Sequence, residues 1–348
     1  MARARRGRPS RENVLRALDT AVDDLASVGG LPLPVEAEAI WEGIWFEEAH
    51  HSTAIEGNTL VLKEVERLLG EGKAVGSKEL AEYLEVEGYA KAAEWVYAQA
   101  VQQTAEWSSG ELISLTELRQ IHKLVVEPVW LHSPPGGLDS GEGPGSFRRN
   151  DIRPFTGGMA PPPFPEVPSL VSDWLADVNR GPAGGRHPML FVADLHARFE
   201  RIHPFRDGNG RTGRLATNLL LVRHGFPPAV IYKRDRPKYL NALRRADRGD
   251  PGPLAEMVAR AVTDGIYRFL LPGLAGPNRL VPLRSLADDV LSGNALAVAA
   301  KRGRLRAVRR TDQWYSTKQW VQQYKDSRYK RGPGPPALNL DPFQEDEN

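Results

Sequence analysis

The 348-residue sequence contains no cysteine. Disulfide bonds and zinc sites with thiolate ligands are therefore excluded, and an intracellular location is the natural expectation. No apolar run approaches the roughly 18 residues that a membrane-spanning helix needs. The N-terminus, MARARRGRPSRE, is basic but lacks the apolar segment of a signal peptide. We therefore expect a soluble, cytoplasmic protein with no membrane partner.

Neither sign of charge is in large excess, because 46 Lys and Arg oppose 44 Asp and Glu and leave a net charge of +2. The 41% hydrophobic and 26% charged residues are ordinary for a soluble globular protein. The length suffices for two or three compact units with a sizeable buried core. The near-neutral total hides an uneven distribution of basic residues along the chain.

Composition and periodicity divide the chain into five expected segments. Residues 1–12 contain five arginines and are expected to be a disordered basic arm. Residues 332–348 are expected to be a disordered tail. Between them we expect a helical N-terminal region (13–110), a helical core (111–272) and a small C-terminal module (278–331).

Apolar residues recur at helical spacing through most of the first 272 residues, so the predicted fold class is mainly α. Ser114 and Glu117 have capping-box spacing, and the helix that they open is expected to stop before Pro128. Another helix is expected to end at His203, because Pro204 disfavours helical backbone in the residue before it. Helices are predicted at about 10–25, 35–50, 62–72, 76–105, 114–127, 167–179, 188–202, 214–224, 237–248 and 252–271.

The helical pattern stops between residues 127 and 168, where Gly and Pro are dense. Within this region, the stretch SFRRNDIRPFTGGMAPPPFP has two short extended runs on either side of residues 156–158. Such a pattern predicts a β-hairpin.

The stretch HPFRDGNGRTGR (residues 203–214) carries the clearest chemical signal. It lies between two predicted helices, so the loop ends at a helix N-terminus, where unpaired N–H groups favour an anion. The glycines let the backbone approach a phosphate, and Arg211 and Arg214 supply forked donors. Asp207 is suited to hold Mg²⁺, and His203 can accept a proton at neutral pH. Taken separately, DGNG is an ordinary turn and a histidine at a helix end is usually structural.

The twelve residues together resemble the signature of the Fic family, His-x-Phe-x-Asp/Glu-Gly-Asn-Gly-Arg-x-x-Arg, at every specified position. Residues from about 40 to 271 also follow the layout of that family, a helical region, a hairpin called the flap, and a helical core. The resemblance implies transfer of AMP from ATP to a Ser, Thr or Tyr hydroxyl of a target protein.

The resemblance also implies a role for each matched residue. His203 is the implied general base, Asp207 the implied Mg²⁺ ligand, and Phe205 is expected to pack in the core. Arg214 is expected to meet the γ-phosphate. The implied nucleotide-binding residues of the loop are Gly208, Asn209, Gly210, Arg211, Thr212, Gly213 and Arg214.

Further positions match less closely. Tyr239 and Leu240 fall where family members line the adenine pocket, and Asp247 falls where relatives often carry an asparagine. The flap tip, at Gly157, Gly158 and Met159, is implied to pair with the backbone of the target as an added strand.

The stretch HHSTAIEGNTL contains Ser52, Glu56 and Gly57 in the spacing of an inhibitory motif found in one class of Fic proteins. Without the resemblance, Glu56 is an acid at a helix end and Gly57 its C-cap. With it, Glu56 is expected to pair with Arg214 and to compete with the γ-phosphate. An alternative role for Glu56 is to position a water that removes AMP from the target.

The C-terminal module reads as helix, turn at Gly293, helix, short basic strands and helix, and resembles winged-helix DNA-binding modules. Between residues 301 and 331, eleven Lys and Arg stand against two Asp, a balance suited to phosphate contacts. A helical docking or dimerisation module with a solvated basic face fits equally well. The alternative to an enzyme is thus a DNA-binding regulator whose Fic unit senses nucleotide, and a homodimer is a possible partner state.

Overall fold

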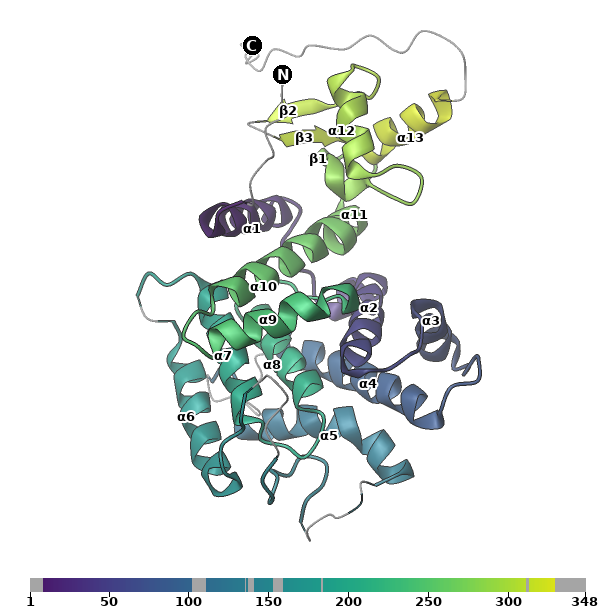
Figure 1. Cartoon of the computed structure of the whole chain (residues 1–348). Coiled ribbons are helices and arrows are strands. Elements are labelled where there is room, and N and C mark those ends of the chain that lie inside the picture. Colours follow the sequence, from purple (N-terminus) through teal and green to yellow (C-terminus); the bar gives the residue numbers. More distant parts are fainter. Residues whose placement is uncertain are drawn as a thin grey trace, which may run out of the picture. The chain divides into compact units, whose positions relative to one another are not determined.

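The computed structural model describes residues 9–101, 111–134, 136, 141–152, 159–182, 184–310 and 313–328. Helices dominate, and within these residues no helix is both long and apolar enough to span a membrane. Figure 1 shows the chain. The first elements are α1 (Arg11–Ala26), η1 (Pro34–Glu36), α2 (Glu38–Glu56), α3 (Leu62–Glu71), α4 (Leu80–Val101), α5 (Leu115–His132), η2 (Phe164–Glu166), α6 (Val167–Arg180), α7 (Pro188–Ile202) and α8 (Asn209–Arg223). They are followed by η3 (Lys233–Asp235), α9 (Arg236–Ala246), α10 (Gly252–Gly265), η4 (Ile266–Leu270), α11 (Leu271–Leu274), β1 (Val281–Pro282), η5 (Leu283–Leu286), α12 (Gly293–Lys301), β2 (Val308–Arg310), β3 (Gln313–Ser316) and α13 (Lys318–Ser327).

The chain divides into two compact units. The first comprises residues 1–22 and 31–265, and the second comprises residues 23–30 and 266–348. The expected N-terminal region and helical core therefore form a single unit. Residues 266–272, expected in the core, group with the C-terminal module instead. Arg11 and Glu12, expected in the basic arm, begin α1, whereas Arg3, Arg5, Arg6 and Arg8 lie outside the described residues.

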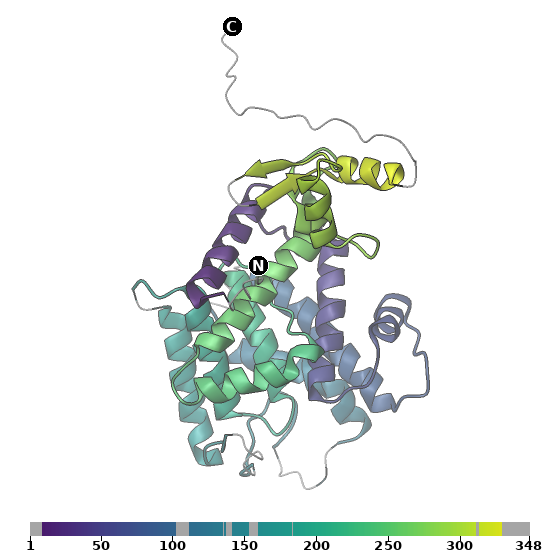
Figure 2. The same ribbon diagram turned by 45° about the horizontal axis from the view of Figure 1, so that its top comes forward.

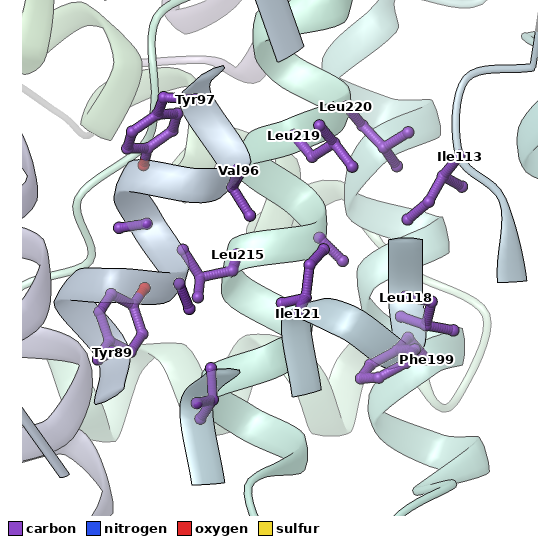
Figure 3. Close-up of a cluster of buried hydrophobic side chains, with 14 of the residues drawn as sticks. Tyr89, Val96, Tyr97, Ile113, Leu118, Ile121, Phe199, Leu215, Leu219 and Leu220 are labelled. Atoms are coloured by element: carbon purple, nitrogen blue, oxygen red, sulfur yellow. The ribbon is translucent and has the colours of Figure 1, made fainter. Parts of the chain in front are cut away.

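Helix α8 is the centre of the first unit. It is buried on almost every side, and both views place it among α4, α5 and α7 (Figures 1 and 2). Figure 3 shows Leu215 and Leu219 of α8 between the side chains of α4 and those of α5. Such a helix needs no amphipathic stripe, because neighbouring helices cover all its faces. The loop at residues 203–208 thus leads directly into a helix that is buried on almost every side.

Helix α5 differs from its prediction at the C-terminal end. Its capping box forms as predicted, with Ser114 Oγ accepting from the Glu117 N–H at 3.2 Å. The helix does not stop before Pro128 but continues to His132. A proline inside a helix removes the N–H that would bond to the carbonyl four residues earlier, here that of Leu124. Burial of Val125 and Val126 against neighbouring helices compensates for that loss.

Two other predictions need correction in the first unit. Helix α2 runs from Glu38 to Glu56, so it starts later and ends later than the predicted 35–50. Because it ends at Glu56, the motif residues Ser52 and Glu56 belong to its last two turns. For the predicted hairpin, the described residues 146–152 and 159–163 contain no strand, and the tip residues Gly157 and Gly158 lie outside the described part of the chain.

The second unit contains a three-stranded antiparallel sheet in the order β1-β3-β2. Val308 pairs with Tyr315, and Val281 pairs with Ser316. Gly293 does not form the predicted turn between helices. It begins α12 instead, directly after Ser292, whose Oγ caps the helix by accepting from the Ala295 N–H at 3.2 Å. A small core of its own, including Leu286, Leu296 and Val321, holds the unit together.

The close approach of α4 to α5 gives a test of the fold. A Cβ at Gly88 would lie 2.7 Å from Val125 O and 3.1 Å from Leu124 O, which are backbone atoms that cannot move aside. We expect Gly88→Ala to lower the free energy of unfolding by about 2 kcal/mol, although alanine favours helix. The measurement is chemical denaturation of both proteins.

Gly70 provides the matched control, because a Cβ there would meet only Phe46 at 3.8 Å. Gly70→Ala should raise stability by up to about 1 kcal/mol. Equal effects of the two substitutions would contradict the close backbone contact between α4 and α5.

Candidate functional site

The loop between α7 and α8 has a strained turn at its start. His203 is the C-cap of α7 with φ 49° and ψ 60°, and it is the non-glycine residue with positive φ in the described part of the chain. Such backbone costs about 1 kcal/mol or more for a residue with a Cβ. Helix α7 therefore ends with His203 as its C-cap, as was predicted from Pro204.

The imidazole of His203 is partly buried at the edge of the loop. Its Nδ1 lies 3.2 Å from Glu200 O, so a proton on Nδ1 bonds to this carbonyl and leaves Nε2 as the basic nitrogen. Burial is the main cause that lowers the pKa of His203 from 6.5. The ring is therefore neutral at pH 7 and able to accept a proton.

The turn into α8 presents backbone N–H groups at its first residues. The first intrahelical bond at this end is donated by Thr212 N to Gly208 O at 2.9 Å, so the N–H groups of residues 209–211 precede the helical ladder. Gly208 has φ 75°, and a Cβ there would lie 2.5 Å from Val126 Cγ1. Only glycine fits this position, and a helix N-terminus of this kind is suited to bind an anion.

The side chain of Asn209 does not face an anion, contrary to the prediction. Its Oδ1 accepts from Phe205 N at 2.9 Å, and its Nδ2 donates to Phe205 O at 2.9 Å. Asn209 therefore holds the loop closed, and only its backbone N–H is left for a ligand. Phe205 is fully buried and stacks on His122, with ring centroids 3.7 Å apart, as expected of a packing residue.

Asp207 and Arg211 form the outer side of the site. The carboxylate of Asp207 is 65% exposed, and its Oδ2 lies 3.1 Å from Arg211 Nη2. Arg211 is buried, its Nη1 is 3.4 Å from Glu85 Oε1, and its Nε has no hydrogen-bond partner among the described residues. The described residues contain no group of three or more His, Asp or Glu suited to hold a metal by themselves. A single open carboxylate fits Mg²⁺, which is usually bound by one or two carboxylates together with substrate phosphates and water.

Arg214 forms the inner side, and α2 supplies its partners. Its Nε donates to Ser52 Oγ at 2.7 Å, and its Nη2 donates to Ser52 O at 2.9 Å and to Glu56 Oε1 at 2.8 Å. The sequence predicted this ion pair. A Cβ at Gly210 would overlap Glu56 Oε1, so the carboxylate lies against the first turn of α8. Burial alone would lower the pKa of Arg214, but the nearby charge of Glu56 and the other acidic groups raise it, and the guanidinium stays charged.

A further contact between α2 and α8 was missed by the sequence reasoning. Glu48 is buried, and its carboxylate accepts from Tyr89 at 2.6 Å, from Asn218 at 2.7 Å and from Tyr97. Glu48, Ser52 and Glu56 are spaced by four residues, as are Asn218, Arg214 and Gly210 on α8. The two helices thus meet through a polar row, and the four-residue spacing of polar positions in α2 was the available signal.

Glu200 is a second acid that the sequence did not single out. It lies in α7, and its Oε1 is buried with no hydrogen-bond partner among the described residues. Burial, opposed by Arg214, raises its pKa from 4.5 to about 7. The nearest basic atom that the structure records, Nε2 of His196, is 3.9 Å away, and burial lowers the pKa of that histidine to about 3.

Several predicted nucleotide-binding residues do not reach the surface of the site. Thr212 is fully buried. Gly213 of α8 packs against Phe199 and Glu200 of α7. Tyr239 lies beneath Arg214, with its ring centroid 5.9 Å from the guanidinium carbon, and its hydroxyl is 2.7 Å from His196 Nε2.

The remaining predicted residues have other surroundings. Leu240 is half-buried, and Asp247 Oδ1 accepts from Arg201 Nε at 3.0 Å. Met159 lies in the described part of the chain and is half-buried. A cavity of about 710 Å³ lies on the other face of α9, lined by Lys238, Asn241 and Arg245 among others, and none of the predicted adenine residues lines it.

Comparison with known proteins agrees with this geometry. Residues 112–221 match the sequence profile of the Fic/DOC family. The chain is 33% identical to "Protein adenylyltransferase Fic" of Culex quinquefasciatus over 79% of this chain and 51% of the relative. It is 32% identical to the protein of that name from Aedes aegypti, over 78% of this chain and 51% of the relative. The chain therefore spans about half the length of these curated relatives.

Solved structures show the same fold. Fic-1 from C. elegans superposes with a TM-score of 0.60 and 25% identity, covering 75% of this chain and 72% of that one. A Fic family protein from Desulfovibrio desulfuricans G20 superposes with a TM-score of 0.57 and 21% identity, covering 91% of this chain and 98% of that one. Residues 112–221 thus match a Fic/DOC domain, and the chain is similar to Fic proteins over most of its length.

The buried carboxyl of Glu200 predicts a pH dependence of stability. Because its folded pKa of about 7 lies above the ordinary 4.5, its contribution is fully present below pH 4.5 and is lost as the pH rises through 7. Because Glu200→Gln stays neutral at every pH, we expect its free energy of unfolding to gain up to about 3 kcal/mol relative to that of the parent between pH 5 and pH 8. Chemical denaturation at both pH values measures this difference.

The exposed acid Glu66 on α3 supplies the control, since Glu66→Gln should track the parent at both pH values. If Glu200→Gln also tracks the parent, the carboxyl of Glu200 is not protonated in the folded protein.

Proposed function

We propose that the protein is an adenylyltransferase that transfers AMP from ATP to a Ser, Thr or Tyr hydroxyl of a target protein and is held inactive by Glu56. The observation that carries the proposal is the Fic loop, with its open N–H groups, a neutral histidine and two buried arginines. The name shared by the curated relatives supports it.

In this reaction the hydroxyl oxygen of the target bonds to the α-phosphorus of ATP. The bond from that phosphorus to the bridging oxygen breaks, and pyrophosphate leaves. The hydroxyl proton passes to Nε2 of His203, the general base, whose Nδ1 is fixed on Glu200 O at 3.2 Å. Such transfers depend on placement and charge neutralisation more than on covalent help.

The remaining roles follow from position. The N–H groups of residues 209–211 bind phosphate oxygens, and Arg211 adds a buried positive charge. Asp207 holds Mg²⁺ with its exposed carboxylate. The ion supplies charge neutralisation on the phosphates. The flap, with Met159, receives the target, and Leu240 and Asp247 border the adenine. Tyr239 is buried next to Arg214 and supports that side of the site.

Glu56 acts as a brake because it takes the place of a phosphate. Its carboxylate accepts a hydrogen bond from Arg214 at 2.8 Å and lies against the first turn of α8. A γ-phosphate meeting Arg214 would be repelled by this carboxylate and would find its donors occupied. ATP then binds without the in-line placement that attack requires.

The test is incubation of the Glu56→Gly protein with ATP labelled on the α-phosphate, followed by detection of label on protein. We expect at least about tenfold faster labelling than by the parent, because lost placement costs orders of magnitude in rate. His203→Ala in the Glu56→Gly background should remove the labelling.

Two results would count against this reading. Labelling no faster than the parent's would reject the brake, and labelling that survives His203→Ala would reject the base. If the parent releases AMP from previously labelled protein and Glu56→Gly does not, Glu56 serves removal of AMP instead.

A second function, DNA binding by the C-terminal unit, is favoured by its topology. In a winged-helix module a recognition helix precedes a two-stranded wing, which agrees with α12 followed by β2 and β3 in a β1-β3-β2 sheet. Exposed basic residues follow α12, among them Arg302 and Arg304. We propose that this face contacts DNA phosphates.

Electrophoretic mobility shift at several salt concentrations tests this proposal. Replacing Arg302 and Arg304 with Glu should weaken DNA binding and reduce its salt dependence, because fewer phosphate contacts release fewer counterions. The control is charge reversal of the exposed Lys63 and Lys91 in the first unit. If replacing Arg302 and Arg304 leaves DNA binding unchanged, the result argues for a docking role of this unit.

A further inference from the structure

Arg148 is a buried cation whose hydrogen bonds go to backbone carbonyls. Its Nε donates to His203 O at 2.8 Å, and its Nη2 donates to Pro162 O at 2.6 Å. Longer bonds run from Nη1 to Asn150 O at 3.2 Å and from Nη2 to Ile202 O at 3.4 Å. All three guanidinium nitrogens are therefore used, and two of them reach the last residue of α7 and the residue after it.

The charge of Arg148 has little other compensation. Its side chain is 0% exposed, and the Asp151 carboxylate, 3.8 Å away, is 69% exposed. Burial lowers the pKa of Arg148, a sign that the cation is costly here. An apolar side chain of similar volume would avoid this cost. What the arginine provides at this place is a fork of donors that reaches four backbone carbonyls.

The strained turn at His203 supplies that need. Left-handed backbone at a residue with a Cβ persists only where the surroundings determine it. The main chain of Arg148 adds another constraint, because its N–H donates to Pro204 O at 2.9 Å. Arg148 thus holds the carbonyls on both sides of the bond between His203 and Pro204.

We propose that Arg148 is the positioning residue of His203, fixing the backbone that aims the imidazole into the Fic loop. The proposal depends on the base role given to His203 above. Arg148 does not touch nucleotide or the reacting atoms in this scheme. It joins the segment around residue 150, the segment around residue 162 and the end of α7, so that all three keep one arrangement.

A lysine cannot replace this arrangement, because it has a single nitrogen and no planar fork. It keeps the positive charge, however, and so separates geometry from charge. Arg149, the next residue, is exposed and gives a matched control. Arg149→Lys makes the same chemical change outside the set of bonds to His203.

The experiment uses the full chain with Glu56→Gly, and compares Arg148→Lys, Arg148→Ala and Arg149→Lys. We expect Arg148→Lys to lower kcat by roughly 10–100-fold, since misplacement of about 1 Å costs up to about 10² in rate. The KM for ATP should stay within about twofold, because the phosphate-binding groups are unchanged. Guanidinium ion added at low millimolar concentration should restore part of the activity of Arg148→Ala.

A readout independent of turnover follows the ring itself. The imidazole resonances of His203 are assigned by their loss in His203→Asn, and are expected to shift or split in Arg148→Lys but not in Arg149→Lys. Thermal unfolding of each variant shows which of them remain folded. Rescue by guanidinium then distinguishes lost positioning from lost folding.

The outcomes separate this proposal from the function on which it rests. Activity of Arg148→Lys within twofold of its Glu56→Gly parent, or the same loss in Arg149→Lys, overturns the positioning role while the enzyme stands. Loss in Arg148→Ala that guanidinium does not restore also overturns it. If Glu56→Gly labels no protein, the proposed function fails, and the His203 resonances still decide whether Arg148 positions the ring.

Discussion

A buried arginine and a carboxylate from another helix meet at the anion site, and the rest of the first unit is arranged around them. Arg214 lies in α8, surrounded by the helices of the core, where an unpaired charge would be strongly unfavourable. Glu56 at the end of α2 supplies the opposite charge at 2.8 Å. The carboxylate stands where a phosphate would, so the contact that completes the folded site is also the one proposed to keep it inactive.

The placement of Glu56 depends on polar contacts farther along the same helix. Ser52, one turn earlier, binds Arg214 of α8, and Glu48, two turns earlier, binds both α8 and α4. These contacts fix the rotation of α2 and its position along its own axis. Buried polar networks of this kind specify one arrangement because each unsatisfied member would cost free energy. Arg148 is proposed to hold His203 in a similar way, through hydrogen bonds to backbone carbonyls. The site is thus held from two directions by groups that do not react.

Much of the site could be predicted because its information is local. The turn at His203 follows from Pro204, and the pair of Ser52 and Glu56 was recognised from a short motif. The errors have a common origin in longer-range packing. Helix α5 continues through Pro128 because buried neighbours compensate for the lost bond. Asn209 was expected to face a ligand, but the curvature of the loop turns its amide back onto Phe205. Glu48, Glu200 and Arg148 carry no motif, since their roles depend on partners many residues away.

The sequence by itself determined the helices, the anion-binding loop and the chemical types of the residues in it, because these depend on neighbours within about one or two turns. It also placed a carboxylate and a serine at helical spacing in a segment distant from that loop. Only the tertiary structure decided which polar groups are used in holding the loop and which buried carboxyl oxygen is left without a hydrogen-bond partner. Those outcomes depend on how the helices pack, since burial and Coulomb interactions act through space rather than along the chain.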